Sequence, residues 1–299
     1  MHKLRSYVLP FAIVVGLVFH RYLVGLREVT PWLIFSILLL NDVAVDMKKL
    51  KVTMLHVWIM FFQIVVSLGS YFLFKAFGAS ELVAQGVLVG VLCPVAAASV
   101  VIATMLGANR ETVTTYTIVG NLMVAIVAPI YFSFIGILQE LPFLDSVWLI
   151  FRRVAPIIAL PFFLALFLQK FLPGVNAFLC RYKGLSFYLW AAALTITLGQ
   201  TLDFLFLEGQ KEVSNILIMS GASIIFCIIQ FAVGKRLGGK YGDRIAGGQI
   251  LGQKNSAMGI WLANTYLMPL ASVFPALYSI WQNLFNSWQL WRKDHPLRN

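Results

Sequence analysis

The residues best equipped for chemistry lie together in one polar stretch, GGQILGQKNSAMG, at positions 247–259. Its five polar side chains are three amides, one hydroxyl and a single amine: Gln249, Gln253, Lys254, Asn255 and Ser256. Amide and hydroxyl oxygens can ligate a cation, whereas amide N–H groups and an ammonium can bind an anion or take the place of a cation. The stretch therefore has the groups of an ion site, with a lysine at its centre.

The rest of the chain is strongly apolar. Of its 299 residues, 60% are hydrophobic and 12% are charged, whereas an ordinary soluble domain has about 25% charged residues. Apolar runs recur from Tyr7 to Trp291, and many have roughly the 20 residues that a helix needs to cross a bilayer. This composition predicts an all-α polytopic membrane protein. The basic start MHKLRS leads into the first run without a small-residue cleavage site, so we interpret that run as a span.

Hydropathy and polar punctuation divide the chain into ten predicted transmembrane helices joined by short loops. Their ranges are 7–26, 30–46, 53–77, 81–107, 111–138, 147–169, 184–202, 212–235, 241–267 and 269–291. Because no long linker separates them, we expect a single membrane domain over residues 1–299.

The basic residues predict the orientation of these spans. Sixteen of the 23 Lys and Arg residues fall in the termini and loops on one side, and six fall on the other. The positive-inside rule then places both termini in the cytoplasm of a multi-pass protein in the cell (inner) membrane. The one basic residue that belongs to neither side is Lys254.

Ten spans divide into two halves of five, and the fourth span of each half is interrupted. The first interruption is Pro94, within GVLVGVLCPVAAASVVIATMLG at 86–107, and the second lies around Gly252 in the polar stretch. Since five is odd, the halves would have inverted orientation, and interrupted helices at matching positions of inverted repeats point to a transporter's midplane site. Alternatively, Pro94 only kinks a packed helix and the glycines only allow close packing.

Helix geometry places Lys254 deep in the membrane. It follows Arg244 by ten residues, or about 15 Å at 1.5 Å per residue. This is half of a hydrocarbon core roughly 30 Å thick. Unwound backbone at that depth is tolerated where it is buried in protein or lines a watery cavity.

Three stretches of the chain resemble the bile acid:sodium symporter family of ten-helix transporters. They are LCPVAAASVVIATMLGAN, GQKNSAMG and VFPALYSIWQNLFNS, which resemble the broken fourth helix, the broken ninth helix and the tenth helix of that family. The resemblance implies two broken helices that cross. It also implies a core sub-domain from spans within 53–138 and 212–291, a panel sub-domain from spans within 7–46 and 147–202, and a substrate cavity between them.

The resemblance also implies two sodium sites, and this chain departs from both. At the first site Ser99 and Thr117 are retained, but apolar residues occupy three other ligand positions: Val100, Val113 and Ile250. At the second site Ile250 replaces a glutamate and Lys254 a glutamine, while Gln253 and, with a one-residue shift, Gln63 stay as oxygen donors. Two unit charges 4 Å apart repel by about 4 kcal/mol at an effective dielectric of 20. We therefore expect Lys254 to stand where a sodium ion would stand, with no cofactor and no other metal.

Lys254 has four readings from the sequence. It is permanently charged and sits on carbonyls at the ends of the broken helices, or it takes up and releases a proton in each cycle. It contacts an anionic substrate directly, or its side chain extends to the membrane interface. Asp42 lies near the end of the second span, where we expect a solvated carboxylate rather than a partner of Lys254.

The resemblance places the substrate against amides and a hydroxyl from the ninth and tenth helices. These residues are Asn255, Ser256, Gln282 and Asn283. Interhelical hydrogen bonding is the alternative role for such side chains. A threonine of the family's cavity is here Ala97, so the substrate of the family need not be the substrate of this chain.

Together these features predict a secondary active transporter of small organic anions that works by alternating access in the lipid bilayer. We expect it to be sodium-independent or proton-coupled, without a nucleic-acid partner, and the sequence leaves its oligomeric state open. The alternatives are a conventional sodium symporter, an arsenite- or auxin-type efflux carrier with Cys93 as a thiol ligand, and a membrane sensor that binds without translocating. An enzyme is not expected, because no histidine pair, carboxylate pair or nucleophile–base spacing is present.

Overall fold

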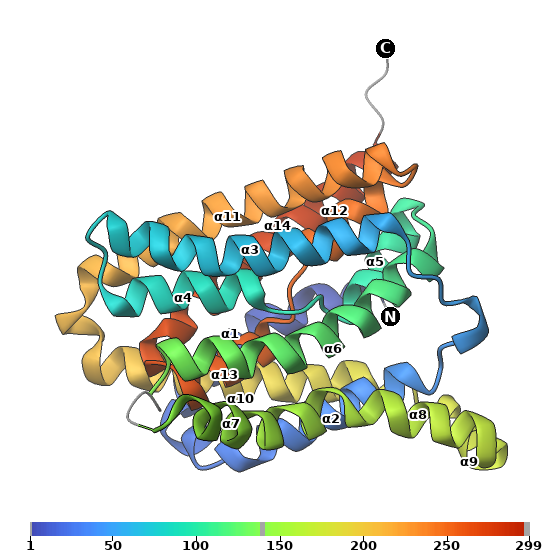
Figure 1. Cartoon of the computed structure of the whole chain (residues 1–299), viewed down its shortest axis with the longest axis horizontal. Coiled ribbons are helices and arrows are strands. Elements are labelled where there is room, and N and C mark those ends of the chain that lie inside the picture. The colour runs from blue at the N-terminus through green and yellow to red at the C-terminus, as the bar shows by residue number, and fades with distance from the viewer. Residues whose placement is uncertain (1, 138–140, 296–299) are drawn as a thin grey trace.

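The computed structural model describes residues 2–137 and 141–295, and in this part of the chain the predicted all-α fold is confirmed (Figure 1). The α-helices are α1 (His2–Val24), α2 (Thr30–Asp42), α3 (Met54–Ala76), α4 (Glu81–Leu92), α5 (Ala98–Leu106), α6 (Arg110–Ile135), α7 (Phe143–Ile158), α8 (Leu160–Phe171), α9 (Pro173–Arg181), α10 (Leu185–Glu208), α11 (Val213–Lys240), α12 (Arg244–Gly252), α13 (Ser256–Tyr266) and α14 (Val273–Asp294). Short 3-10 helices are η1 (Arg27–Val29), η2 (Met47–Lys49), η3 (Gly209–Lys211) and η4 (Pro269–Ser272). The predicted end of the fifth span, residue 138, lies outside the described residues.

Several of these helices are long and apolar enough to cross a bilayer. Four candidates are α3, α6, α11 and the unit Leu185–Lys211. Two bent pairs raise the number to six, namely Val14–Val24 with Arg27–Asp42 (100°) and Phe143–Ile158 with Leu160–Phe171 (42°). These helices indicate a multi-pass membrane protein. The other predicted spans fall on shorter or more polar helices: α4 with α5, α12 with α13, and α14.

The sixth predicted span is bent rather than straight. The sequence interpretation placed one helix over 147–169, but α7 ends at Ile158 and α8 begins at Leu160. Pro161 occupies the first turn of α8. Proline has no N–H to donate and its ring disfavours helical backbone in the residue before it, which explains the bend.

Local capping sets the ends of the helices that matter for the site. The side chains of Ser80, Asn109, Asp243 and Asn255 each accept a hydrogen bond from a backbone N–H in the first turn of α4, α6, α12 and α13. Such caps stabilise a helix start by about 1 kcal/mol. At the other end of α5, Gly107 has a left-handed backbone with φ of 103°. Glycine adopts this conformation without strain.

The helices form two groups with α6 and α13 between them (Figure 1). In one group α3 packs on α4, and α11 packs on α12 and α14; in the other α10 packs on α1 and α2, and α2 packs on α8. The backbones of α11 and α12 pass very close to each other. A Cβ atom built on Gly234 would lie 2.3 Å from the Gly247 carbonyl oxygen. Only glycine permits backbones to come this near, which explains the glycines before the polar stretch.

Candidate functional site

Two interrupted helices meet at the centre of the protein. The chain leaves helical geometry between α4 and α5 at 93–97 and between α12 and α13 at 253–255. The two segments run antiparallel as an isolated bridge between Val95 and Lys254. Ala96 N–H donates to the Gln253 carbonyl (3.1 Å), and Asn255 N–H donates to the Pro94 carbonyl (2.8 Å). Backbone groups freed by the breaks thus pair with each other, as burial requires.

The carbonyl end of α4 is bound by an amide from α3. Gln63 Nε2 donates to the carbonyl oxygens of Leu92 (2.6 Å) and Cys93 (2.9 Å), and its Oε1 accepts from the Tyr116 hydroxyl (2.9 Å). Gln63 has no exposed surface. An α-helix leaves its last carbonyls without partners, and here a neutral amide satisfies them.

The second break is held by two side chains of α14. The Tyr278 hydroxyl donates to the Gly252 carbonyl at the end of α12 (2.7 Å). Gln282 holds the backbone of Lys254 on both sides, because its Oε1 accepts from the lysine N–H (2.6 Å) and its Nε2 donates to the lysine carbonyl (3.0 Å). The Gln282 amide also reaches the Ser256 hydroxyl (3.3 Å). The backbone of Lys254 is therefore fixed independently of its side chain.

The Lys254 ammonium nitrogen is buried without a hydrogen-bond partner among the described residues. The residue is 2% exposed, so its side chain does not extend to a membrane interface, and that reading is wrong. Among the described residues the ammonium also makes no hydrogen bond to the helix-end carbonyls, which accept from Gln63 and Tyr278 instead. Next to it, the buried Cys93 thiol donates to the Asn255 carbonyl (2.9 Å).

The residues at the implied sodium sites do not fit a sodium ion. Val113 and Ile250 lie in one buried apolar cluster, and Val100 packs against it. Thr117 donates its hydroxyl to the Val113 carbonyl one turn earlier (2.9 Å), and the Ser99 hydroxyl is buried without a partner in the described structure. The first site therefore keeps two hydroxyl oxygens amid hydrocarbon, fewer than the several oxygens that a hard cation needs.

Metal binding elsewhere has no obvious ligands either. Within residues 2–137 and 141–295, no three His, Cys, Asp or Glu side chains come together as a metal site.

Asp42, expected to be solvated, is only 5% exposed at the end of α2, so that expectation is wrong. The loop after α2 folds back over this end, where Gln169 binds the Val45 carbonyl (2.9 Å).

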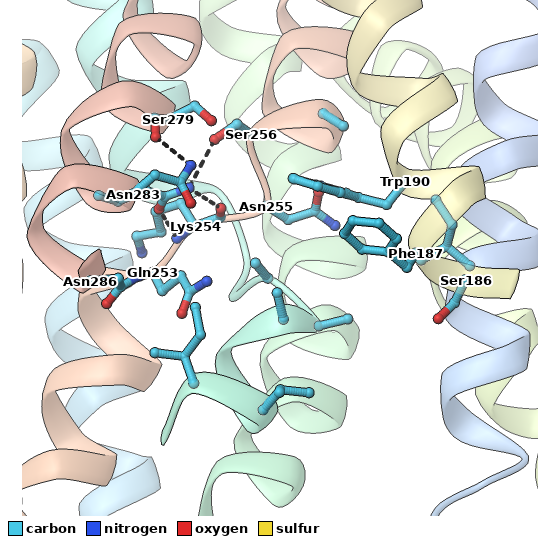
Figure 2. A pocket seen from close by; sticks show the side chains of 18 of the residues that line it. Ser186, Phe187, Trp190, Gln253, Lys254, Asn255, Ser256, Ser279, Asn283 and Asn286 are labelled. Carbon is cyan, nitrogen blue, oxygen red and sulfur yellow. Dashed lines mark hydrogen bonds between the residues drawn. The ribbon is translucent and has the colours of Figure 1, made fainter. Parts of the chain in front are cut away.

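The place where the two unwound segments 93–97 and 253–255 pair is called the crossing below. A cavity of about 520 Å³ lies beside it (Figure 2). On one side it is lined by the second break and by α14, and on the other by α2, α5 and α10. The predicted residues that line it are Gln253, Lys254, Asn255, Ser256, Gln282 and Asn283. Pro94, Gly252, Ser99, Thr117 and Gln63 are not among the lining residues. The structure thus brings the predicted substrate residues together at the cavity surface. Of the ion-site residues, Gln253 also lines the cavity, whereas Ser99, Thr117 and Gln63 do not.

The amides of α14 are largely engaged within the protein. Gln282 Nε2 donates to the Lys254 carbonyl and the Ser256 hydroxyl. Asn283 Nδ2 donates to the Ser279 carbonyl of its own helix (2.7 Å). For Gln282 the structure shows the interhelical alternative. Asn255 Oδ1 accepts from the Met258 N–H as the cap of α13 (3.3 Å). Figure 2 shows the rest of the Asn255 side chain extending toward Trp190.

The opposite wall of the cavity is aromatic and apolar. Figure 2 shows Phe187 and Trp190 of α10 facing the crossing, and Ile34 and Ile37 of α2 also line the cavity. Sequence reasoning missed this wall because the polar residues and glycine of α10 lie mainly beyond Thr195, whereas the part that holds Phe187 and Trp190 reads as an ordinary apolar span. It likewise missed Tyr116 and Tyr278, whose hydroxyls act at the crossing.

Two helices begin at this cavity. Ala97 and Ala98 at the start of α5, and Ser256 and Ala257 at the start of α13, line it. A helix N-terminus carries free N–H groups and a positive end of the helix dipole, equivalent to roughly half an elementary charge. With Lys254 as the sole ionisable residue in the lining, the cavity favours a negatively charged group near the crossing.

Two polar contacts join α13 and η4 to neighbouring elements at a place away from the cavity. Arg27 from the segment between α1 and α2 donates to the Asn264 carbonyl of α13 (2.9 Å). Thr201 of α10 shares a hydrogen bond with Ser272 of η4 (2.9 Å). These residues belong to the ends of the helices remote from the cavity. These contacts hold α13 and η4 against α10 and the segment between α1 and α2, away from the cavity.

In comparisons with known proteins, no family model matches this chain, and no curated protein matches its sequence significantly. The resemblance to the bile acid:sodium symporter family therefore stays a prediction from the sequence.

Proposed function

We propose that the chain is a sodium-independent secondary transporter of small organic anions, similar to the bile acid:sodium symporters, with Lys254 in place of a sodium ion. The observation that carries this proposal is the cavity beside the crossed helices. Its lining combines two helix N-termini, an unpartnered amine and an aromatic wall, which suits an acid with an apolar body.

The proposal includes ten spans in two inverted repeats of five. The half-helices of each broken span, α4 with α5 and α12 with α13, have 9 to 12 residues and are individually too short to cross a bilayer. Joined across their breaks, they reach the length of a span. The antiparallel pairing of Val95 with Lys254 supports equivalent breaks that meet near the midplane.

The basic residues indicate which side the cavity faces. Its outer lining includes Asn41, Met105, Ser186 and Leu290, at the ends of α2, α5, α10 and α14. Each of these ends adjoins a basic terminus or loop that the charge distribution assigns to the cytoplasm. The cavity would then open inward, with the contacts of Arg27 and Thr201 closing the outer side. Alternating access requires those contacts to break as the inner opening closes.

Lys254 would supply the coupling. An ammonium buried without a partner is costly, and the cost is removed when the amine loses its proton or when an anion enters the cavity. In the proposed cycle the lysine is protonated together with substrate binding and is neutral when the empty carrier returns. This favours the proton-exchanging reading of Lys254 over a permanent charge held by carbonyls.

The test is transport by the purified protein in proteoliposomes. Labelled monocarboxylates of four to ten carbons would be offered in sodium-free buffer to vesicles loaded with the same unlabelled acid. The proposal predicts counterflow of at least one acid without sodium, and its loss in Lys254→Met. Binding without counterflow would show a sensor, and counterflow that requires sodium would show a conventional symporter. A block by thiol reagents that Cys93→Ala relieves would favour the arsenite-type carrier.

A further inference from the structure

Three carboxamides form a second polar group along the cavity, on the cytoplasmic side of the crossing as assigned above. Gln249 and Gln253 lie one turn apart at the end of α12, and Asn286 faces them from α14. Gln249 Nε2 donates to Asn286 Oδ1 (2.9 Å), and Gln289 Nε2 approaches the same oxygen (3.3 Å). These bonds fix which end of each amide in the Gln249–Asn286 pair is a donor and which is an acceptor.

The group keeps three polar atoms without partners among the described residues. They are the Oε1 oxygens of Gln249 and Gln253 and the Nδ2 nitrogen of Asn286. All three residues are at most 3% exposed. A buried polar atom without a partner costs about 1–3 kcal/mol, which apolar side chains of similar size would avoid.

The three atoms lie just beneath the cavity surface, and Gln249, which does not line the cavity, is joined to its wall by the hydrogen bond to Asn286. Gln253 and Asn286 line the cavity, and Figure 2 shows both on its wall below the crossing. The apolar residues Val101, Ile102 and Met105 of α5 line the cavity as well. A ligand group here would meet two carbonyl acceptors and one N–H donor, with hydrocarbon beside them.

The distance from the crossing follows from α14. Gln282, which binds the second break, and Asn286 are four residues apart on this helix, or about 6 Å. An anionic group at the starts of α5 and α13 would therefore lie about one helical turn from the amide group.

We propose that Gln249, Gln253 and Asn286 form a subsite for an uncharged polar group of the transported anion, above all a primary carboxamide. A carboxamide has two N–H donors and one carbonyl acceptor, which complement the two oxygens and one nitrogen left unpartnered. A hydroxyl satisfies fewer of these atoms, and a methyl group satisfies none. A second carboxylate would face two carbonyl oxygens, and an ammonium would find no counter-charge. The inference rests on the proposed function, since the acid group must bind at the crossing.

Four acids of equal chain length test the subsite: pentanoate, 5-hydroxypentanoate, glutaramate (the monoamide of glutarate) and glutarate. Their dissociation constants would be measured from the thermal unfolding of the detergent-purified full chain, titrated with each acid. We expect glutaramate to bind about tenfold more tightly than pentanoate, with 5-hydroxypentanoate between them and glutarate weakest.

Variants assign the preference to these residues. Gln253→Leu and Asn286→Leu should each remove the advantage of glutaramate over pentanoate, so that the two acids bind each variant with similar dissociation constants. The matched control is Gln230→Leu, because Gln230 is an equally buried amide with unpartnered atoms that does not line the cavity. It should leave the preference intact.

Each outcome has a distinct meaning. Equal binding of the four acids, or tightest binding of glutarate, would overturn the subsite and leave the anion site at the crossing standing. Binding of none of the four would contradict both the subsite and the proposed function. The comparison on the wild-type chain decides the matter even if a variant does not fold.

Discussion

The two helix breaks pair with each other through their backbones, but they differ in side chains. The first, at 93–97, reads CPVAA and is apolar, whereas the second, at 253–255, reads QKN and is wholly polar. They hydrogen-bond to each other through Ala96 and Asn255 N–H groups. A buried, unwound segment therefore does not need polar side chains of its own when its backbone groups find partners elsewhere.

The carbonyls at both breaks are satisfied from neighbouring helices. Gln63, itself bound by Tyr116, serves the first break, and Tyr278 and Gln282 serve the second. None of these bonds uses the side chain of Lys254. The difference between the breaks teaches that the Lys254 side chain is an addition to a structure already held by neutral groups, as the role proposed for it requires.

The largest effect is expected at the first break. Gln63→Leu removes the donor to Leu92 and Cys93 carbonyls and leaves the Tyr116 hydroxyl buried without its acceptor. With about 1–3 kcal/mol for each buried group left unpaired, we expect a loss of about 4 kcal/mol or failure to fold. Thermal unfolding in detergent measures it. A shift no larger than that of a surface variant would show that the amide does not hold the break.

A slightly smaller effect is expected at the second break. Gln282→Leu removes both hydrogen bonds to the backbone of Lys254, and we expect a loss of about 2–3 kcal/mol. Asn283→Leu is the matched control, because Asn283 bonds only within α14, and it should cost under about 1 kcal/mol. If the two variants are equally stable, the clamp on the second break has no energetic role.

Close packing beside the breaks should give intermediate losses of similar size. An added Cβ would lie 2.1 Å from Phe274 at Gly90 and 2.4 Å from Phe231 at Gly252. Overpacking typically costs about 1–3 kcal/mol, so Gly90→Ala and Gly252→Ala should both lower the unfolding temperature. Gly221→Ala has open space and a helical backbone, and it should be neutral or stabilising. A loss at Gly221 as large as at the breaks would contradict this reading.

The smallest change in stability is expected at Lys254, the residue on which the proposed transport depends most. Lys254→Met keeps the length of the side chain and removes its amine, which has no partner to lose among the described residues. We expect the free energy of unfolding to stay within about 0.5 kcal/mol or to rise, while counterflow is abolished. A loss above about 2 kcal/mol would instead make the ammonium a structural group.

The sequence was informative where a single residue type has a local consequence. Pro94 and the glycines around Gly252 predicted the breaks, and the unusual Lys254 marked their meeting point. Amides in an apolar chain predicted a polar cavity surface. These signals survive because proline, glycine and buried charge act on the backbone or the solvent wherever the helix is placed.

Other features depend on how helices are turned and packed. The bond from Tyr278 to Gly252 spans 26 residues and that from Gln63 to Cys93 spans 30, so neither follows from helical spacing. Trp190 joins the cavity only because α10 presents that face to the crossing. The partners of the helix-end carbonyls depend on the same packing: Gln63 and Tyr278 donate to these oxygens, and the Lys254 ammonium has no hydrogen-bond partner among the described residues.

The most direct test of the central claim is the response of the wild-type protein to sodium. Thermal unfolding would be compared in sodium chloride and potassium chloride of equal concentration, at one pH, in detergent. A bound ion stabilises by RT ln(1 + [L]/Kd), about 2.7 kcal/mol at one hundred times Kd. With Lys254 in place of the ion, the two unfolding temperatures should coincide. A clear sodium-specific rise would contradict the account and show a sodium site built from residues other than those identified at the crossing.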